Sequence, residues 1–177
     1  MDKALLEEQL RELPILEYAF FPASELPFSE RVRYVCRTQC PMYGKSWACP
    51  PAVGPVADCM QRCRSYPEGL LISTVAEVED VSNLEQTLAT RAAHEAVTRQ
   101  AQQLIRAQAQ EVFVLSTEAC AHCAQCTYPD APCRFPEKMF PCVESHGIIV
   151  STLSERLGLS YENGANTVTW FSVLLYR

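Results

Sequence analysis

Ten cysteines among 177 residues are the feature that most restricts what this chain can fold into. They form two groups, separated by 56 residues without a cysteine. The first group comprises Cys36, Cys40, Cys49, Cys59 and Cys63, and the second comprises Cys120, Cys123, Cys126, Cys133 and Cys142. Such grouping indicates a disulfide framework in a secreted chain, but metal binding or catalysis in a cytosolic one.

The choice between these readings depends on the compartment. Residues 1–8 have the pattern of an acidic amphipathic helix, whereas a signal peptide has a basic region followed by an apolar one. The sequence contains no run of about 18 apolar residues, so no membrane span is predicted. We therefore expect a cytoplasmic protein without a membrane partner. The net charge of −6 also disfavours nucleic acid as a partner, because phosphates favour a basic surface.

The apolar pattern predicts one α/β domain over residues 1–177. Helices are expected over 2–12, 56–64, 82–110 and 144–157, and strands over 15–21, 69–75, 112–115 and 167–176. Ser82 followed by Glu85 has the form of a capping box at the start of the long helix. That helix and its flanking strands form a βαβ-like unit. We expect a small mixed sheet whose strand ends lead into two cysteine-rich zones, 31–67, mostly loop, and 120–142.

The second group contains two consecutive CxxC spacings, over Cys120, Cys123 and Cys126, and then Cys133 directly after Pro132. Two-residue gaps let a loop curl around a cubane, and Cys133 is near enough in sequence to supply a fourth thiolate. The spacing is similar to the bacterial ferredoxin run, although the last gap has six residues rather than three. A [4Fe–4S] cluster is therefore the first interpretation. Zinc is the alternative, although structural zinc sites usually pair two separated CxxC knuckles.

The gaps between Cys36, Cys40, Cys49 and Cys59 in the first group are three, eight and nine residues. They match no motif, but thiolates gathered in a cytosolic protein remain reactive unless a metal binds them. The hypothesis is a second [4Fe–4S] cluster on Cys36, Cys40 and Cys49, with Cys59 as the fourth ligand. Cys63 is the alternative fourth ligand, because a helix would place it on the same face as Cys59. Some of these cysteines could instead be small buried apolar residues.

Several neighbours of the cysteines suit an anionic cluster. Tyr43 and Trp47 can form an apolar lid over the first group that limits oxidation. Lys45 could donate to a cluster sulfur or simply be solvated. His122 is expected to be solvated, and Cys142 to be a spare thiol. The first zone also contains cations that can offset thiolate charge or lie on a solvated surface, namely Arg31, Arg33, Arg37, Lys45, Arg62 and Arg64.

Two long motifs make the chain resemble a known family. They are CRTQCPMYGKSWACPPAVG, from Cys36 to Gly54, and CAHCAQC followed by CRFPE, within Cys120 to Glu137. Together with residues 144–148 and 168–176, they are similar to DUF2284, a family of predicted metal-binding proteins. The resemblance covers nearly the whole chain and implies cysteine-bound metal, but no defined reaction. The family has a serine where this chain has Cys142, which implies that Cys142 is not an essential ligand.

Three functions fit these observations. The first is a small electron carrier with two clusters that serves a redox partner protein. The second is an enzyme in which three cysteines leave one iron open, so that it acts on a small-molecule substrate as a Lewis acid or accepts sulfur in desulfuration or dehydration chemistry. The third is a zinc-binding scaffold or metal-delivery protein. The sequence contains no GxGxxG or Walker motif and no recognisable Ser–His–Asp set.

Overall fold

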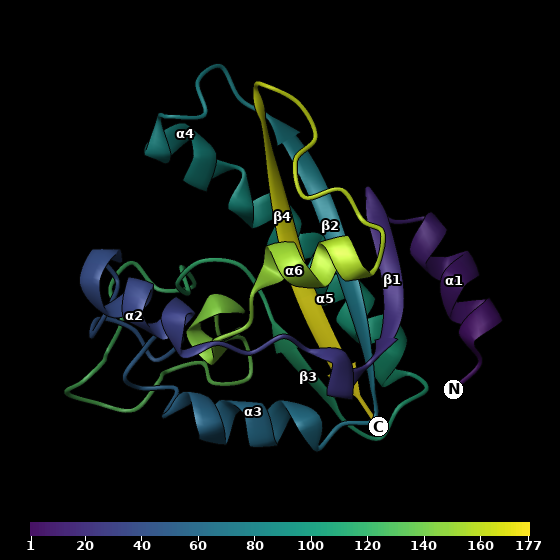
Figure 1. Ribbon diagram of the computed structural model, residues 1–177, viewed down its shortest axis with the longest axis horizontal. Helices are drawn as coiled ribbons and strands as arrows, with labels where there is room; N and C mark the ends of the chain where they lie inside the picture. Colours follow the sequence, from purple (N-terminus) through teal and green to yellow (C-terminus); the bar gives the residue numbers. More distant parts are fainter.

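A sheet of four strands in the order β1-β2-β4-β3 forms the centre of the computed structural model, which describes all 177 residues (Figure 1). The strands are β1 (Glu17–Pro22), β2 (Glu68–Glu77), β3 (Val112–Leu115) and β4 (Thr167–Tyr176). All neighbouring strands are antiparallel. β2 and β3 run in the same direction with β4 between them, so the βαβ-like unit is a split one. The α/β class is confirmed, but the expected mixed pairing is corrected to antiparallel pairing, because the long apolar β4 takes the central place.

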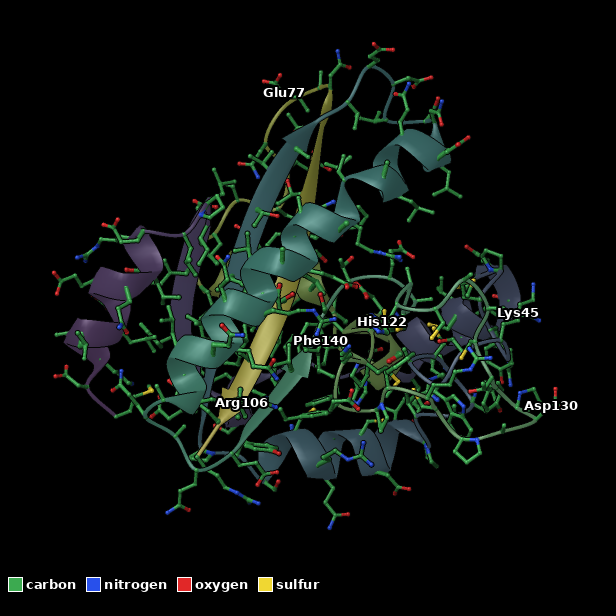
Figure 2. The ribbon with its side chains drawn as sticks, turned by 180° about the vertical axis from the view of Figure 1, so that it is seen from behind. Lys45, Glu77, Arg106, His122, Asp130 and Phe140 are labelled. Atoms are coloured by element: carbon green, nitrogen blue, oxygen red, sulfur yellow. The ribbon has the colours of Figure 1, made fainter.

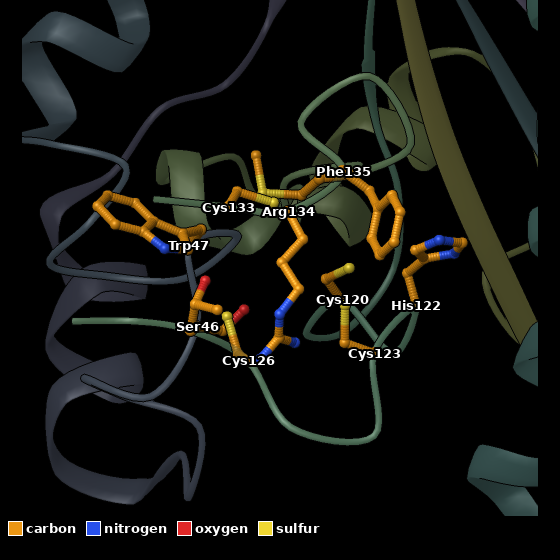
Figure 3. Close-up of a pocket in the computed structure, with 11 residues that line it drawn as sticks. Ser46, Trp47, Cys120, His122, Cys123, Cys126, Cys133, Arg134 and Phe135 are labelled. Atoms are coloured by element: carbon orange, nitrogen blue, oxygen red, sulfur yellow. The ribbon is translucent and has the colours of Figure 1, made fainter. Parts of the chain in front are cut away.

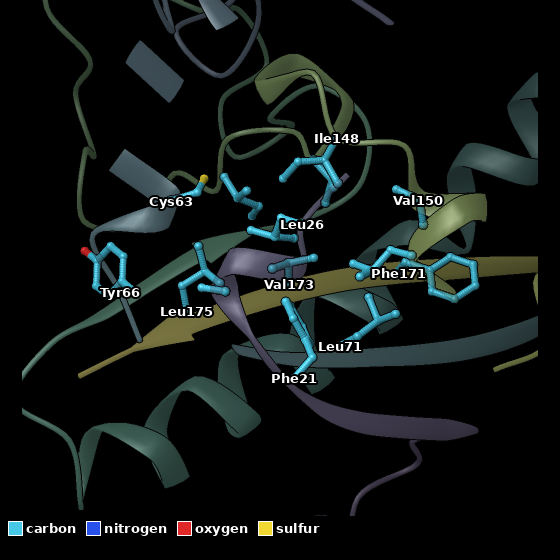
Figure 4. Packing of buried hydrophobic residues seen from close by; sticks show 14 residues of the cluster. Phe21, Leu26, Cys63, Tyr66, Leu71, Ile148, Val150, Phe171, Val173 and Leu175 are labelled. Atoms are coloured by element: carbon cyan, nitrogen blue, oxygen red, sulfur yellow. The ribbon is translucent and has the colours of Figure 1, made fainter. Parts of the chain in front are cut away.

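Helices cover both faces of this sheet. They are α1 (Lys3–Arg11), α2 (Glu30–Gln39), α3 (Val56–Arg64), α4 (Leu84–Ala89), α5 (Arg91–Arg106) and α6 (Val150–Arg156), with 3-10 turns η1 (Ala23–Glu25) and η2 (Glu144–His146). α1 and α5 pack against Leu70 and Leu174 on one face. η1, α3 and α6 pack against Leu71 and Val173 on the other (Figure 4). None of the helices has the length and apolar character needed to cross a membrane.

Two expected helices are interrupted. Asn83 rather than Ser82 caps the first, because its side chain accepts hydrogen bonds from two backbone N–H groups of the first turn, while Ser82 bonds to Asp80. The helix then breaks at Thr90, which separates α4 from α5. The helix expected over 144–157 is also divided, because Gly147 has a φ of +80° that no helix accommodates.

The first cysteine zone is less irregular than expected, because it contains α2 as well as the expected α3. No residue of α2 is buried, so the apolar periodicity that reveals a helix in a sequence is missing. Its signal is instead at the N-terminus, where the side chain of Ser29 accepts a hydrogen bond from the N–H of Arg31.

A polar network crosses the core between α5 and the sheet. His94 lies 2.8 Å from the hydroxyl of Thr74 through Nδ1 and 2.8 Å from that of Ser172 through Nε2. The Ser172 hydroxyl extends this hydrogen-bond network by donating to the hydroxyl of Ser116 over 2.9 Å. Burial lowers the pKa of His94 to about 4, so its imidazole is neutral at neutral pH.

Candidate metal centres

The two cysteine zones lie together at one end of the molecule. In Figure 2 their sulfur atoms gather between His122 and Lys45, and no disulfide joins any of the ten cysteines. The second zone leaves the end of β3 and returns to it: Ser116 donates to the carbonyl of Pro141, and Val143 donates to the carbonyl of Ser116. The zone itself contains no helix or strand, as its four prolines predict.

The second centre is the set Cys120, Cys123, Cys126 and Cys133, whose side chains line one pocket (Figure 3). Phe135 and Met139 contribute apolar walls. Burial raises the pKa of the Cys120 thiol, and the charges of Glu95, Cys133 and Cys123 raise it further, although the backbone N–H of His122 opposes them. These thiols are therefore near neighbours. The four cysteines that the sequence assigned to one cluster share one pocket.

Hydrogen-bond donors surround Cys126 in this pocket. Burial alone would raise the pKa of its thiol, but backbone N–H groups of Tyr128, Trp47 and Thr127 and the hydroxyl of Ser46 together lower it. Such donors stabilise a thiolate and, in cluster proteins, tune the potential of the bound group. The chemistry of this donor set fits a thiolate-bound metal group.

Trp47 belongs to the first zone but covers the second centre, not the first group as the sequence suggested. Its indole Nε1–H donates to the carbonyl of Ala131 over 3.0 Å. Its ring also meets that of Tyr128 edge-on, with centroids 4.9 Å apart. The indole N–H needs an acceptor, and the second zone supplies it, so Trp47 holds the two zones together.

The first centre is the set Cys36, Cys40 and Cys49. Cys36 lies in the last turn of α2, and Cys40 follows the helix in an extended conformation, which Pro41 favours. A turn then brings the chain back to Cys49: Gly44, with a φ of +72°, donates to the carbonyl of the residue after Cys49 over 2.8 Å.

The three thiols of the first centre repel one another when charged. Burial raises the pKa of Cys49 to about 12, and the charges of Cys40 and Cys36 add to this effect. Burial and the charge of Cys40 also raise the pKa of Cys36. Three neighbouring thiols of this kind need a cation to be held as thiolates together.

Cys142 lies beside the first centre, although it ends the second zone in sequence. Its N–H donates to the carbonyl of Ala48 over 3.2 Å, and its thiol donates to Oε2 of Glu144 over 2.8 Å. Burial raises the pKa of the Cys142 thiol well above its usual value, and the charges of Glu144 and Cys49 contribute. Burial also raises the pKa of Glu144. No local pattern indicates this approach, because 92 residues lie between Cys49 and Cys142.

Cys59 and Cys63 share one face of α3, as expected, and both are fully buried. The Cys59 thiol lies 3.4 Å from the carbonyl of Val53. Burial raises its pKa, and the charges that most affect it are those of Arg33, Arg62 and Asp58, none of which is a cysteine. Cys63 packs in the apolar cluster against the sheet. The structure thus gives Cys142 a backbone contact to the residue before Cys49, whereas the contacts of Cys59 are with Val53 and Arg33.

Arg33 ties α2 to the rest of the molecule. Its guanidinium donates to the carbonyls of Gly54, over 2.7 Å, and of Ser145, over 2.5 Å. Nη2 also lies 4.0 Å from the Cys59 sulfur. Among the cations of this zone, Arg33 is therefore a structural clamp, whereas Arg31, Arg37 and Lys45 are exposed.

Ser46 is fully buried between the two centres. Its hydroxyl opposes the effect of burial on the pKa of Cys49 and also helps to lower the pKa of Cys126, so it reaches one thiol of each centre. Figure 3 shows Ser46 beside Cys126. Sequence reasoning did not single out Ser46, and its only signal was its place in the first motif. No three His, Cys, Asp or Glu side chains converge as ligands of one ion would; the thiols of the second centre surround a pocket instead.

The comparisons with known proteins agree with a metal-binding role. A family described as a predicted metal-binding protein, DUF2284, matches residues 19–176. This range contains both centres and the whole of β2, β3 and β4. No curated protein and no solved structure is similar enough to match.

Proposed function

The chain belongs to the DUF2284 family of predicted metal-binding proteins, and on that premise we propose that it is an iron–sulfur protein that transfers electrons. The observation that carries the proposal is the pocket lined by the thiols of Cys120, Cys123, Cys126 and Cys133. These residues would hold one [4Fe–4S] cluster, and Cys36, Cys40 and Cys49 would hold a second. Such clusters supply reversible one-electron chemistry.

The surroundings of the thiols support this role. Phe135 and Met139 exclude water from part of the second pocket, and the donors around Cys126 suit a charged sulfur. Ser46 reaches a thiol of each centre, so the two centres are close enough to be coupled. We propose a redox partner protein as the source or acceptor of electrons.

A second candidate function is an enzyme with an iron open to a small-molecule substrate. It is favoured by the make-up of the first centre, where three thiols, rather than four, come from the first zone. The carboxylate of Glu144 affects the pKa of Cys36, and that of Glu118 affects Cys49, so acidic groups are at hand for proton transfer. A zinc-binding scaffold is the remaining alternative.

Metal analysis distinguishes these functions. After anaerobic purification we expect about eight irons and about eight acid-labile sulfides per chain, together with the EPR signals of two reduced cubanes. Stoichiometric zinc without sulfide would contradict the proposal. Replacing Cys123 with alanine should remove about half of the iron, whereas replacing the core residue Cys63 with alanine serves as the matched control and should remove none.

A further inference from the structure

The position of the backbone at Cys142 gives the first centre a fourth thiol. The strand-like bridge between Ser116 and Cys142 closes the base of the second zone. From that bridge the Cys142 N–H donates to the carbonyl of Ala48, the residue before Cys49. Two backbone contacts therefore fix Cys142 against the first zone.

The Cys142 side chain makes a hydrogen bond beside this backbone contact, and its thiol lies within electrostatic range of Cys49. Its sulfur is 2.8 Å from Oε2 of Glu144. Cys49 is among the groups that raise the pKa of Cys142, after burial and Glu144, and Glu144 in turn raises the pKa of Cys36, after burial and Cys40. Cys142 and Glu144 are thus bonded to each other, and each lies within electrostatic range of a thiol of the first centre, Cys49 and Cys36 respectively.

Cys59, the fourth ligand suggested by sequence, has other partners. Its sulfur lies 3.4 Å from the carbonyl of Val53 and 4.0 Å from Nη2 of Arg33. A thiol whose neighbours are a carbonyl of the loop before α3 and a guanidinium of α2 has a structural role that needs no metal.

We propose that Cys142 is the fourth thiolate of the first centre, which closes it to outside ligands, in place of the spare, non-essential thiol that the family resemblance implied. The assignment rests on the proposed iron–sulfur function. Ligation of a cluster iron would break the S–H bond of Cys142. Glu144, whose carboxylate accepts the hydrogen bond of this thiol, would take the proton.

The test compares three alanine variants purified anaerobically, C142A, C59A and C63A. We expect C142A to lose about one iron per chain and to give the EPR signal of a three-iron cluster after mild oxidation. C59A and the control C63A should keep the iron content and EPR spectrum of the wild type. Full iron and an unchanged spectrum in C142A, or iron loss in C59A, would overturn the assignment.

A measurement on the wild type keeps the assignment testable if C142A does not fold. Added cyanide should leave both EPR signals unchanged, because every iron has a thiolate, whereas a shifted signal would reveal an open iron and overturn it. C142S offers the smaller change and should shift the signal of one centre only. The proposed function fails by a different result. Zinc without sulfide in the wild type would overturn the function, whereas two clusters in the wild type and unchanged iron in C142A would overturn only the assignment of Cys142.

Discussion

The two centres differ in what holds their cysteines in place. The first is built on the end of α2 and the turn that follows it, and the Arg33 clamp and the backbone contact between Cys142 and Ala48 fasten it to the remainder of the fold. The second lies in a loop without regular structure, fastened at its base by the Ser116 bridge and from above by Trp47. The first centre is therefore preformed by the scaffold, whereas the second depends more on what binds there.

Removing the metal should produce the largest difference in protease resistance between the two zones. Thiolates left together in the second pocket repel, and the binding energy that orders such a loop is lost. We expect limited proteolysis after anaerobic chelation to cut within 120–142 but to spare 56–64, where Val56, Cys59 and Cys63 remain buried. Equal cleavage of both segments would show that the first zone depends on bound metal as much as the second does.

Acid should affect both centres together, because it acts on the shared core. Burial lowers the pKa of both His94 and His146 from 6.5 to about 4. The unfolded chain therefore binds more protons between these values, and stability that is present above pH 6.5 is lost as the pH falls toward 4. The expected loss is about 3 kcal/mol for each histidine.

Urea unfolding at pH 7 and pH 5 measures this effect. His94→Gln should unfold more easily at pH 7 but with a smaller difference between the two pH values, since the variant has one buried imidazole fewer. A pH dependence identical to that of the wild type would show that His94 does not contribute.

Replacing Arg33 should weaken only the first centre. Arg33→Met removes two hydrogen bonds from a charged donor to backbone carbonyls, which we expect to cost about 3 kcal/mol. Iron should be released faster from the first centre, as seen by chelator kinetics with EPR, and the second should keep its rate. Arg37→Met is the matched control, because Arg37 is exposed on the same helix and should change neither rate.

The smallest effect is expected from replacing Trp47, and it concerns the second centre. Trp47→Phe keeps an aromatic ring but loses the hydrogen bond to Ala131, at a cost of about 1 kcal/mol. The EPR signal of the second centre should decay faster in air than in the wild type. Tyr43→Phe, in the same loop, is the control, and equal decay in the two variants would argue against a protective role for Trp47.

Local patterns allowed most elements to be predicted. The strand at 112–115, the strand at 167–176 and the helix at 56–64 have the predicted bounds, because their apolar periodicity is strong and their ends carry clear breaks. α2 could not be predicted this way, since it buries no residue. The central place of β4 depends on tertiary competition between strands, which no local pattern encodes.

The site shows the same limit. The CxxC spacings predicted which cysteines share the second pocket, because short gaps restrict geometry. The approach of Cys142 to Cys49 depends on how β3 and its bridge are placed, so spacing carries no information about it. Cys59 was the nearest thiol in sequence, but helix α3 turns it toward Val53.

Ser46 has a consequence for how the two centres would behave as a pair. Its oxygen accepts a hydrogen bond from the N–H of Ala48 over 3.2 Å, which leaves its single proton for the sulfurs of Cys49 and Cys126. One proton cannot serve both sulfurs fully at once. If each centre held a redox cluster, the cluster that gained an electron would attract the hydroxyl, and the other would lose a donor and become harder to reduce. Stepwise reductive titration of the wild type and of Ser46→Ala would measure this effect. If the two midpoint potentials lie closer together in the variant, a single buried hydroxyl makes the protein accept its electrons one at a time.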